Sequence, residues 1–357
     1  MGRKKRRMHK KAKIWAASAA AAVLLAFGGY TVYLYQGKLA AQAQAEEWRQ
    51  QREAGGADGA AQAGEEFGQV KDEIVYNGDT YVRNTYMKAY LFLGVDRPGT
   101  FTEPTVPGQG GQSDGIFLAA WDTSRNTVQV VMIPRDTMTE IILTDLSGNE
   151  LGADVQHITL GYAYGDGLER SCEYMSRAVT NLCGGLGIDG YMSIGLGALP
   201  VLNDLVGGVE VTVEDGSLAE ADDRFTLGET IRLEGDEAER FLRYRDIGVT
   251  QTAIGRMDRH KTYLEGFARA AKKTARKEDG LAVKILDGIA PYMVTDMAKD
   301  EYLKLAADFL SSSQTLTKAD FLTLPGEGAE TGLYDEYHVD KDEVLQLILG
   351  LFYRQKE

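Results

Sequence analysis

The chain has 357 residues and a formal net charge of −14. Its first 13 residues contain eight basic side chains and no acidic one, so the remainder carries −22. A domain this acidic argues against nucleic acid as a partner, and it makes any local cluster of arginines informative.

Residues 14–35 predict a transmembrane helix. These 22 residues carry no charge, and a helix of that length spans about 33 Å, enough for a bilayer core. The basic residues 1–13 precede the span, so we expect a cytoplasmic N-terminal tail and an extracytoplasmic remainder, in a single-pass protein of the cell membrane. The alternative is a cleaved signal peptide, because residues 41–43 (Ala-Gln-Ala) resemble a cleavage site. The apolar stretch exceeds the usual signal core, which favours an uncleaved anchor.

Residues 36–75 predict a polar stalk. The segment is rich in Ala, Gln and Glu, and Gly55 and Gly56 interrupt it. Plain disorder is the alternative for this segment. Residues 76–357 are then one extracytoplasmic domain.

Strand-length apolar runs alternate with helical patterns in this domain. Residues 116–121 and 128–133 are joined by residues of turn composition, which predicts a hairpin. The strands are apolar throughout, so we expect helices on both sheet faces and an α/β architecture. We expect two helices and a strand in residues 280–357, closing the same domain. The other predicted strands are 89–95 and 209–213, and the predicted helices are 168–182, 197–206, 236–245, 254–275, 297–311 and 341–353.

The two cysteines predict buried thiols. Cys172 and Cys183 lie 11 residues apart, about 16 Å along one predicted helix, which is too far for a disulfide. Small buried thiols explain them best. Four scattered histidines without a CxxC or HExxH motif give no zinc pattern.

Charged residues stand at the ends of three predicted strands. Asp96 and Arg97 follow the first apolar run, Asp114 precedes the hairpin, and Arg135 and Asp136 follow it. An antiparallel hairpin brings Asp114 beside Arg135 and Asp136. Each residue alone is explained as a charged strand cap, but together they predict a site for magnesium and phosphate, since magnesium takes one or two carboxylates plus phosphate oxygens.

A second set of basic residues closes one predicted helix and opens the next. Those on the second helix have i, i+3 and i+4 spacing, so they share a face near a helix N-terminus. Guanidinium forks match phosphate oxygens. The alternative is that Asp246 and Asp258 neutralise them in solvated ion pairs. The set is Arg243, Arg245, Arg256, Arg259 and His260.

With these residues identified, the chain resembles the LytR-CpsA-Psr family of surface phosphotransferases. The matching motifs follow the order of the family over residues 92–260. They are FLGVDRP (92–98), QSDGIFLAAWD (112–122), VVMIPRDT (130–137), HITLGYAYGDG (157–167), LVGGVEVTV (205–213), LEGDEAERFLRYRD (233–246) and GRMDRH (255–260).

The resemblance implies a central mixed sheet between helices. It also implies an enzyme that transfers a polyprenyl-diphosphate-linked anionic glycopolymer, of the teichoic acid or capsular polysaccharide type, to peptidoglycan with magnesium and with cleavage of the diphosphate. Carried over by motif, Asp96 and Asp114 hold magnesium. Arg135, Arg243, Arg245 and Arg256 are carried over as the diphosphate clamp, and we expect Arg97 and His260 to bind the diphosphate with them. The expected catalytic set is Arg135, Arg243, Arg245 and Asp246.

Three positions depart from the family pattern. Gln112 stands where Arg is common, His260 where Gln is usual, and Ala253 where an acid is frequent. Protonation would make His260 sensitive to pH. The acceptor base is unassigned by the motif, and Asp246 is its candidate substitute. Two other functions stay open: a polyprenyl-diphosphate hydrolase, and a non-catalytic regulator that binds a lipid diphosphate.

Overall fold

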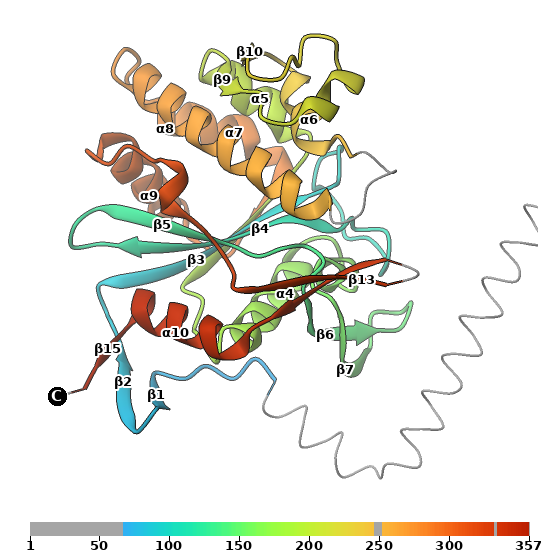
Figure 1. The fold of residues 1–357 in the computed structure, drawn as a ribbon, viewed down its shortest axis with the longest axis vertical. Helices are drawn as coiled ribbons and strands as arrows, with labels where there is room; N and C mark the ends of the chain where they lie inside the picture. The colour runs from blue at the N-terminus through green and yellow to red at the C-terminus, as the bar shows by residue number, and fades with distance from the viewer. Residues whose placement is uncertain (1–66, 246–251, 332–333, 357) are drawn as a thin grey trace, which may run out of the picture. The chain divides into compact units, whose positions relative to one another are not determined.

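The computed structural model describes residues 67–245, 252–331 and 334–356 (Figure 1). The predicted basic tail and transmembrane helix lie outside the described residues, as does Asp246. Within the described ranges, no helix combines the length and the apolar character needed to cross a membrane.

A six-stranded mixed sheet forms the centre of the domain, in the order β11-β8-β3-β4-β5-β12. β4 is antiparallel to both β3 and β5, which confirms the predicted hairpin, while β8 runs parallel to β3 and β12 parallel to β5. The strands are β3 (Met87–Val95), β4 (Ser113–Asp122), β5 (Thr127–Met132), β8 (Gly190–Gly195), β11 (Met293–Thr295) and β12 (Phe321–Thr323).

Helices cover both faces of this sheet, as the continuous apolar strands predicted. Side chains alternate between faces along a strand. Leu91 and Leu93 of β3 join the core under α4 and α10, whereas Tyr90 and Phe92 join the core under α7 and α9. Figure 1 shows α7 and α9 on one side of the sheet and α4 and α10 on the other. The helices are α4 (Glu169–Leu182), α7 (Thr252–Ala275), α9 (Lys299–Ser311) and α10 (Lys341–Phe352).

The hairpin of β6 (Met138–Thr144) and β7 (Glu150–His157) was not predicted, and it begins directly after the charged residues that follow β5. Most residues of β7 are exposed, so its sequence has no alternation of apolar and polar residues that indicates a buried face. The remaining small elements are α3 (Leu160–Ala163), α5 (Ala198–Leu205), α6 (Glu237–Arg243), the 3₁₀ helix η1 (Gly216–Glu220), β9 (Val209–Thr212) and β10 (Thr230–Leu233).

The two helices predicted within residues 280–357 are confirmed as α9 and α10, but the prediction of a single strand was wrong. The described residues of this region also contain the α-helix α8 (Leu281–Ile289), and they form five strands rather than one. The strands have three to five residues, too few for a periodic pattern to identify. Besides β11 and β12, they are β13 (Gly326–Glu330), β14 (Asp335–Val339) and β15 (Tyr353–Gln355).

The domain begins before the predicted boundary at residue 76. Phe67 and Ile74 are buried and belong to the core around α4 and α10. The strands β1 (Glu73–Tyr76) and β2 (Asp79–Arg83) form a small sheet with the C-terminal β15. The end of the predicted stalk is therefore part of the domain.

Both cysteines are free and buried, which confirms the prediction of two core thiols. Burial raises the pKa of each thiol to about 12. Neither is therefore a thiolate at neutral pH.

Replacing Leu118 tests the central core, because its side chain in β4 is completely buried. Leu118→Ala removes buried methyl groups and leaves a cavity, so we expect the free energy of unfolding to fall by about 3 kcal/mol. Urea denaturation of the purified protein measures it. Leu146 is 80% exposed and gives the matched control, with an expected change below about 0.5 kcal/mol. A loss below about 1 kcal/mol for Leu118→Ala would contradict this packing.

Candidate active site

Asp114, at the start of the interior strand β4, joins three elements of the domain. In the pairing of β3 with β4, Gly94 faces Gly115 and Val95 faces Ser113, so Asp114 is the extra residue of a β-bulge. Bulges re-aim side chains and are frequent beside active sites. Arg135, which follows β5, donates from Nη1 to Oδ1 of Asp114. The predicted proximity of Asp114 and Arg135 is confirmed.

Arg256 approaches the same carboxylate from α7. Its Nη1 donates to Oδ2 of Asp114 at 3.3 Å. The Arg256 side chain is only 10% exposed. Burial lowers the pKa of Arg256, Asp114 raises it, and the positive charges of Arg135 and Arg245 lower it again. The carboxylate therefore lies between two guanidinium groups that repel each other.

Gln112 connects Asp96 to this cluster. Its backbone N–H donates to Oδ1 of Asp96 at 2.5 Å, and its side-chain Oε1 accepts from Nη2 of Arg135 at 2.9 Å. An arginine at position 112, which is common in the family pattern, has no acceptor to offer Arg135. Gly111 has a φ of +89°, and a Cβ there would stand 2.8 Å from Oδ1 of Asp96. A side chain at position 111 would therefore displace the Asp96 carboxylate.

Four arginines have buried N–H groups without a hydrogen-bond partner in the described part of the chain. They are Nη1 of Arg97, Nε of Arg135, Nε of Arg256 and Nε of Arg259. Nε of Arg135 lies 3.3 Å from Oδ1 of Asp136 as an ion pair but without hydrogen-bond alignment. A buried unsatisfied donor costs about 1–3 kcal/mol. Two of these arginines are buried and two are half-buried, and their unsatisfied donors are groups to which an anion could bind.

The other arginines predicted to bind the diphosphate each have a different neighbour. Arg245 stands 3.8 Å from Asp335 of β14, and its charge acts on Arg256. Arg243 is 51% exposed and pairs with Glu239 on its own helix at 2.8 Å. Among the described residues, no hydrogen bond or ion pair joins Arg243 to Asp114, Arg135 or Arg256. Arg97 lies over the ring of Phe101, with 5.1 Å between its Cζ and the ring centroid.

His260 does not have the pH sensitivity expected from its sequence position. Burial, with the charges of Arg256 and Arg259, lowers the pKa of His260 to about 3. Its ring centroid lies 5.9 Å from that of Phe117. The imidazole is therefore neutral across physiological pH, and any hydrogen bond to phosphate comes from a neutral ring.

Arg259 has an acidic partner that the sequence did not reveal. Its Nη1 donates to Oδ2 of Asp215 at 2.6 Å. Asp258, one proposed neutralising acid, is exposed and pairs with Lys261 at 3.1 Å instead. Helical spacing correctly placed Arg256 and Arg259 on one buried face, but it could not show a partner 44 residues earlier in the chain.

The sequence profile of the LytR_cpsA_psr family matches residues 54–350. This chain belongs to the LytR-CpsA-Psr family. A polyisoprenyl-teichoic acid–peptidoglycan teichoic acid transferase, TagU of Bacillus cereus, is 25% identical over 252 residues, which cover 69% of this chain and 72% of that protein.

Solved structures of related proteins share the fold. The crystal structure of B. subtilis TagV aligns with a TM-score of 0.53 and 21% identity, over 75% of this chain and 98% of that one. A structure of TagT bound to LI-WTA aligns with a TM-score of 0.54 and 17% identity, over 75% and 90% of the two chains. The mixed sheet between helices is thus the architecture expected for a LytR-CpsA-Psr protein.

The carboxylates of this LytR-CpsA-Psr site fit a magnesium ion only together with a substrate. Among the described residues, no group of three or more acidic, His or Cys side chains is placed to hold a metal. Asp96 Oδ1 accepts from Gln112, and both oxygens of Asp114 accept from arginines. Magnesium usually takes one or two carboxylates and completes its shell with phosphate oxygens and water. Asp96 and Asp114 match that donor set.

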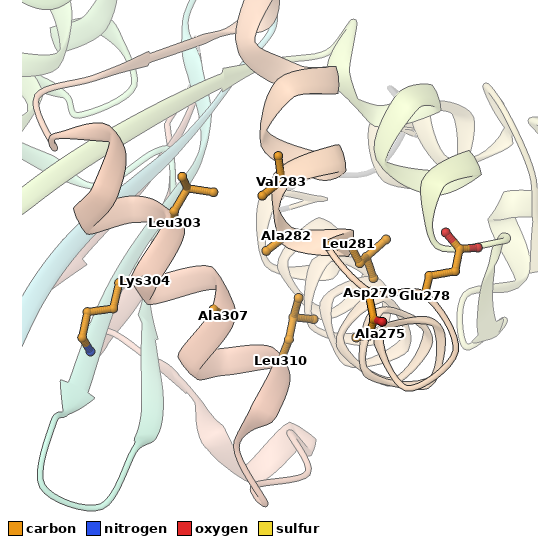
Figure 2. Close-up of a pocket in the computed structure, with 11 residues that line it drawn as sticks. Ala275, Glu278, Asp279, Leu281, Ala282, Val283, Leu303, Lys304, Ala307 and Leu310 are labelled. Atoms are coloured by element: carbon orange, nitrogen blue, oxygen red, sulfur yellow. The ribbon is translucent and has the colours of Figure 1, made fainter.

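An apolar cavity of about 480 Å³ lies away from this site (Figure 2). It is lined by the end of α7, the start of α8 and one side of α9, with Leu281, Leu303 and Leu310 among its side chains. The helix α7 carries Arg256 near its start and reaches the cavity at Ala275, roughly 28 Å further along its axis. The cavity is therefore not part of the arginine cluster.

The pKa of His260 predicts a specific acid sensitivity. An unfolded histidine binds a proton near pH 6.5, whereas folded His260 stays neutral until about pH 3. Protons therefore favour the unfolded state as pH falls from 6.5 towards 3, by up to about 1.4 kcal/mol per pH unit. His260→Gln should flatten this decline. Proton NMR of the imidazole should show no titration above pH 5, and a midpoint near 6.5 would contradict the burial.

Proposed function

We propose that this protein transfers a polyprenyl-diphosphate-linked anionic glycopolymer, of the teichoic acid or capsular polysaccharide type, to peptidoglycan. The observation that carries the proposal is the pair of arginines on Asp114, half-buried Arg135 and buried Arg256, each with an unsatisfied N–H, in a domain that is otherwise acidic. A relative named as a teichoic acid–peptidoglycan transferase supports the polymer class and the acceptor.

The diphosphate is the part of the donor that matches the site. Arg97, Arg135 and Arg256 each present a buried N–H that a phosphate oxygen can satisfy. Guanidinium groups bind phosphate oxygens in a fixed planar geometry. Arg243 and Arg245 approach from the end of α6 and complete the clamp in this proposal.

The reaction exchanges a phosphoanhydride bond for a phosphate ester bond. A sugar hydroxyl of the acceptor attacks the phosphorus attached to the glycopolymer. The P–O bond to the second phosphate breaks, and polyprenyl phosphate leaves with the electron pair. The acceptor is left joined to the glycopolymer through a phosphodiester. Positioning and charge stabilisation supply most of the catalysis in such transfers.

Asp114 has two roles in this scheme. Before the donor binds, it holds the guanidinium groups of Arg135 and Arg256 in place. Magnesium, when bound by Asp96 and Asp114, supplies a further positive charge for the phosphate oxygens. We assign the acceptor proton to Asp246, three residues after Arg243, because the first turn of α7 has Ala253 where the family often has an acid.

The place of the reaction follows from the predicted anchor. The uncharged residues 14–35 would hold the enzyme in the cell membrane beside its lipid-linked donor, with the domain facing peptidoglycan.

Replacing Arg135 tests the clamp. Arg135→Ala removes contacts to Asp114 and Gln112 together with an open donor, so we expect transfer to fall at least about 100-fold. Arg125→Ala is the control, because that arginine is 81% exposed in the turn between β4 and β5. The assay follows a radiolabelled lipid-linked glycopolymer into peptidoglycan, and unchanged transfer by Arg135→Ala would refute the assignment.

The same assay separates the other two functions. Release of polyprenyl phosphate that does not depend on peptidoglycan would identify a hydrolase. Tight donor binding without turnover would identify a regulator.

Metal removal tests the carboxylates. We expect EDTA to abolish transfer and added magnesium to restore it. Asp96→Asn keeps an oxygen for the Gln112 N–H but loses the charge, so the magnesium concentration for half-maximal activity should rise at least about 10-fold. Asp145→Asn, in the exposed turn between β6 and β7, should leave that concentration unchanged. Full activity in EDTA would contradict the metal site.

A further inference from the structure

The segment that carries Arg243 and Arg245 is held in place at Tyr244. Helix α6 ends there, and backbone angles of φ −49° and ψ 135° turn the chain out of the helix. The Tyr244 carbonyl accepts from Nη2 of Arg259 on α7. Its hydroxyl donates to Oε2 of Glu220 in η1 at 2.8 Å. Both the main chain and the side chain of Tyr244 are thus fixed by neighbouring elements.

The Arg259 side chain is built into the fold. The residue is 7% exposed, and its Nη1 donates to Oδ2 of Asp215 at 2.6 Å. Asp215 is itself oriented by Ser217, whose backbone N–H and hydroxyl donate to Oδ1 at 3.0 and 2.6 Å. Burial lowers the pKa of the Arg259 guanidinium, and the negative charge of Asp215 opposes that shift. Arg259 and Asp215 thus form a buried ion pair, and Nη2 of Arg259 donates to the Tyr244 carbonyl.

We propose that Arg259 is a positioning residue for the transfer reaction. Its guanidinium, anchored on Asp215, holds the Tyr244 carbonyl and so sets where Arg243 and Arg245 present their charges. This inference rests on the proposed role of those two arginines at the diphosphate, but the contacts that carry it do not.

One turn of α7 contacts both Asp114 in β4 and Tyr244 at the end of α6. Arg256 contacts Asp114 at the start of β4. Arg259, three residues later on the same helix face, contacts Tyr244 at the end of α6. A helix turn is rigid, so the spacing between the two arginines fixes the segment after α6 relative to the sheet. Lysine cannot replace Arg259. The planar guanidinium donates to Asp215 from Nη1 and to the Tyr244 carbonyl from Nη2, and a single ammonium group cannot reproduce both contacts in that geometry.

Hydrogen exchange tests the positioning without any assay of activity. In full-length Arg259→Lys, we expect amides of the peptide covering residues 241–245 to exchange at least about 10-fold faster, with α4 and α10 unchanged. Asp215→Asn keeps the shape of the partner and should give a smaller increase in the same peptide. Arg269→Ala, an exposed ion-paired arginine further along α7, should change nothing there. Unchanged exchange in both Arg259→Lys and Asp215→Asn would overturn the proposal.

Transfer kinetics separate positioning from general stability. We expect Arg259→Lys to lower kcat about 10-fold with KM changed less than about 2-fold. In an Arg243→Ala/Arg245→Ala background, Arg259→Lys should cost little more, because both arginines through which it acts are already absent. A full 10-fold loss in that background would overturn the proposal. If the wild-type protein transfers nothing, the proposed function fails, and hydrogen exchange alone decides the role of Arg259.

Discussion

The carboxylate of Asp114 is the contact on which the site depends. It accepts hydrogen bonds from Arg135, which follows β5, and from Arg256 on α7. These contacts join the start of β4 to a helix from a distant part of the chain. A buried charge without a partner costs several kcal/mol. The guanidinium groups of Arg135 and Arg256 can therefore lie close together only because the Asp114 carboxylate lies between them. The β-bulge supplies that acid by turning one residue of β4 out of the regular pleat.

Sequence patterns identified the features that depend on neighbouring residues. The apolar runs predicted β3, β4 and β5, and the hairpin predicted that Asp114 would contact Arg135. The bulge was not predictable, because it is a property of register between two strands. The Arg259–Asp215 pair joins α7 to a loop 44 residues earlier, and no local period reports such a contact. Strands of three residues, such as β11 and β12, are too short to show alternation.

Five arginines of the site already have an acidic partner within the chain, whereas Arg97 lies over the ring of Phe101. A weakly charged anion gains little by displacing these carboxylates, whereas the proposed diphosphate would offer several charged oxygens to satisfy the open donors as well. In the proposed transfer, selectivity for a highly charged group would follow from this competition. The pairs are Arg135 and Arg256 with Asp114, Arg243 with Glu239, Arg245 with Asp335, and Arg259 with Asp215.

The small sheet of β1, β2 and β15 joins the two ends of the domain. β15 pairs with β2, and the hydroxyl of Tyr353 donates to the carbonyl of Lys71 at 2.8 Å across 282 positions of sequence. This sheet cannot be completed until β15 has been synthesised, and a contact so distant in sequence forms slowly. During synthesis, β2 therefore keeps one edge open for nearly the whole length of the domain. A chain truncated by a few residues would keep that edge exposed, as a template for pairing with other chains.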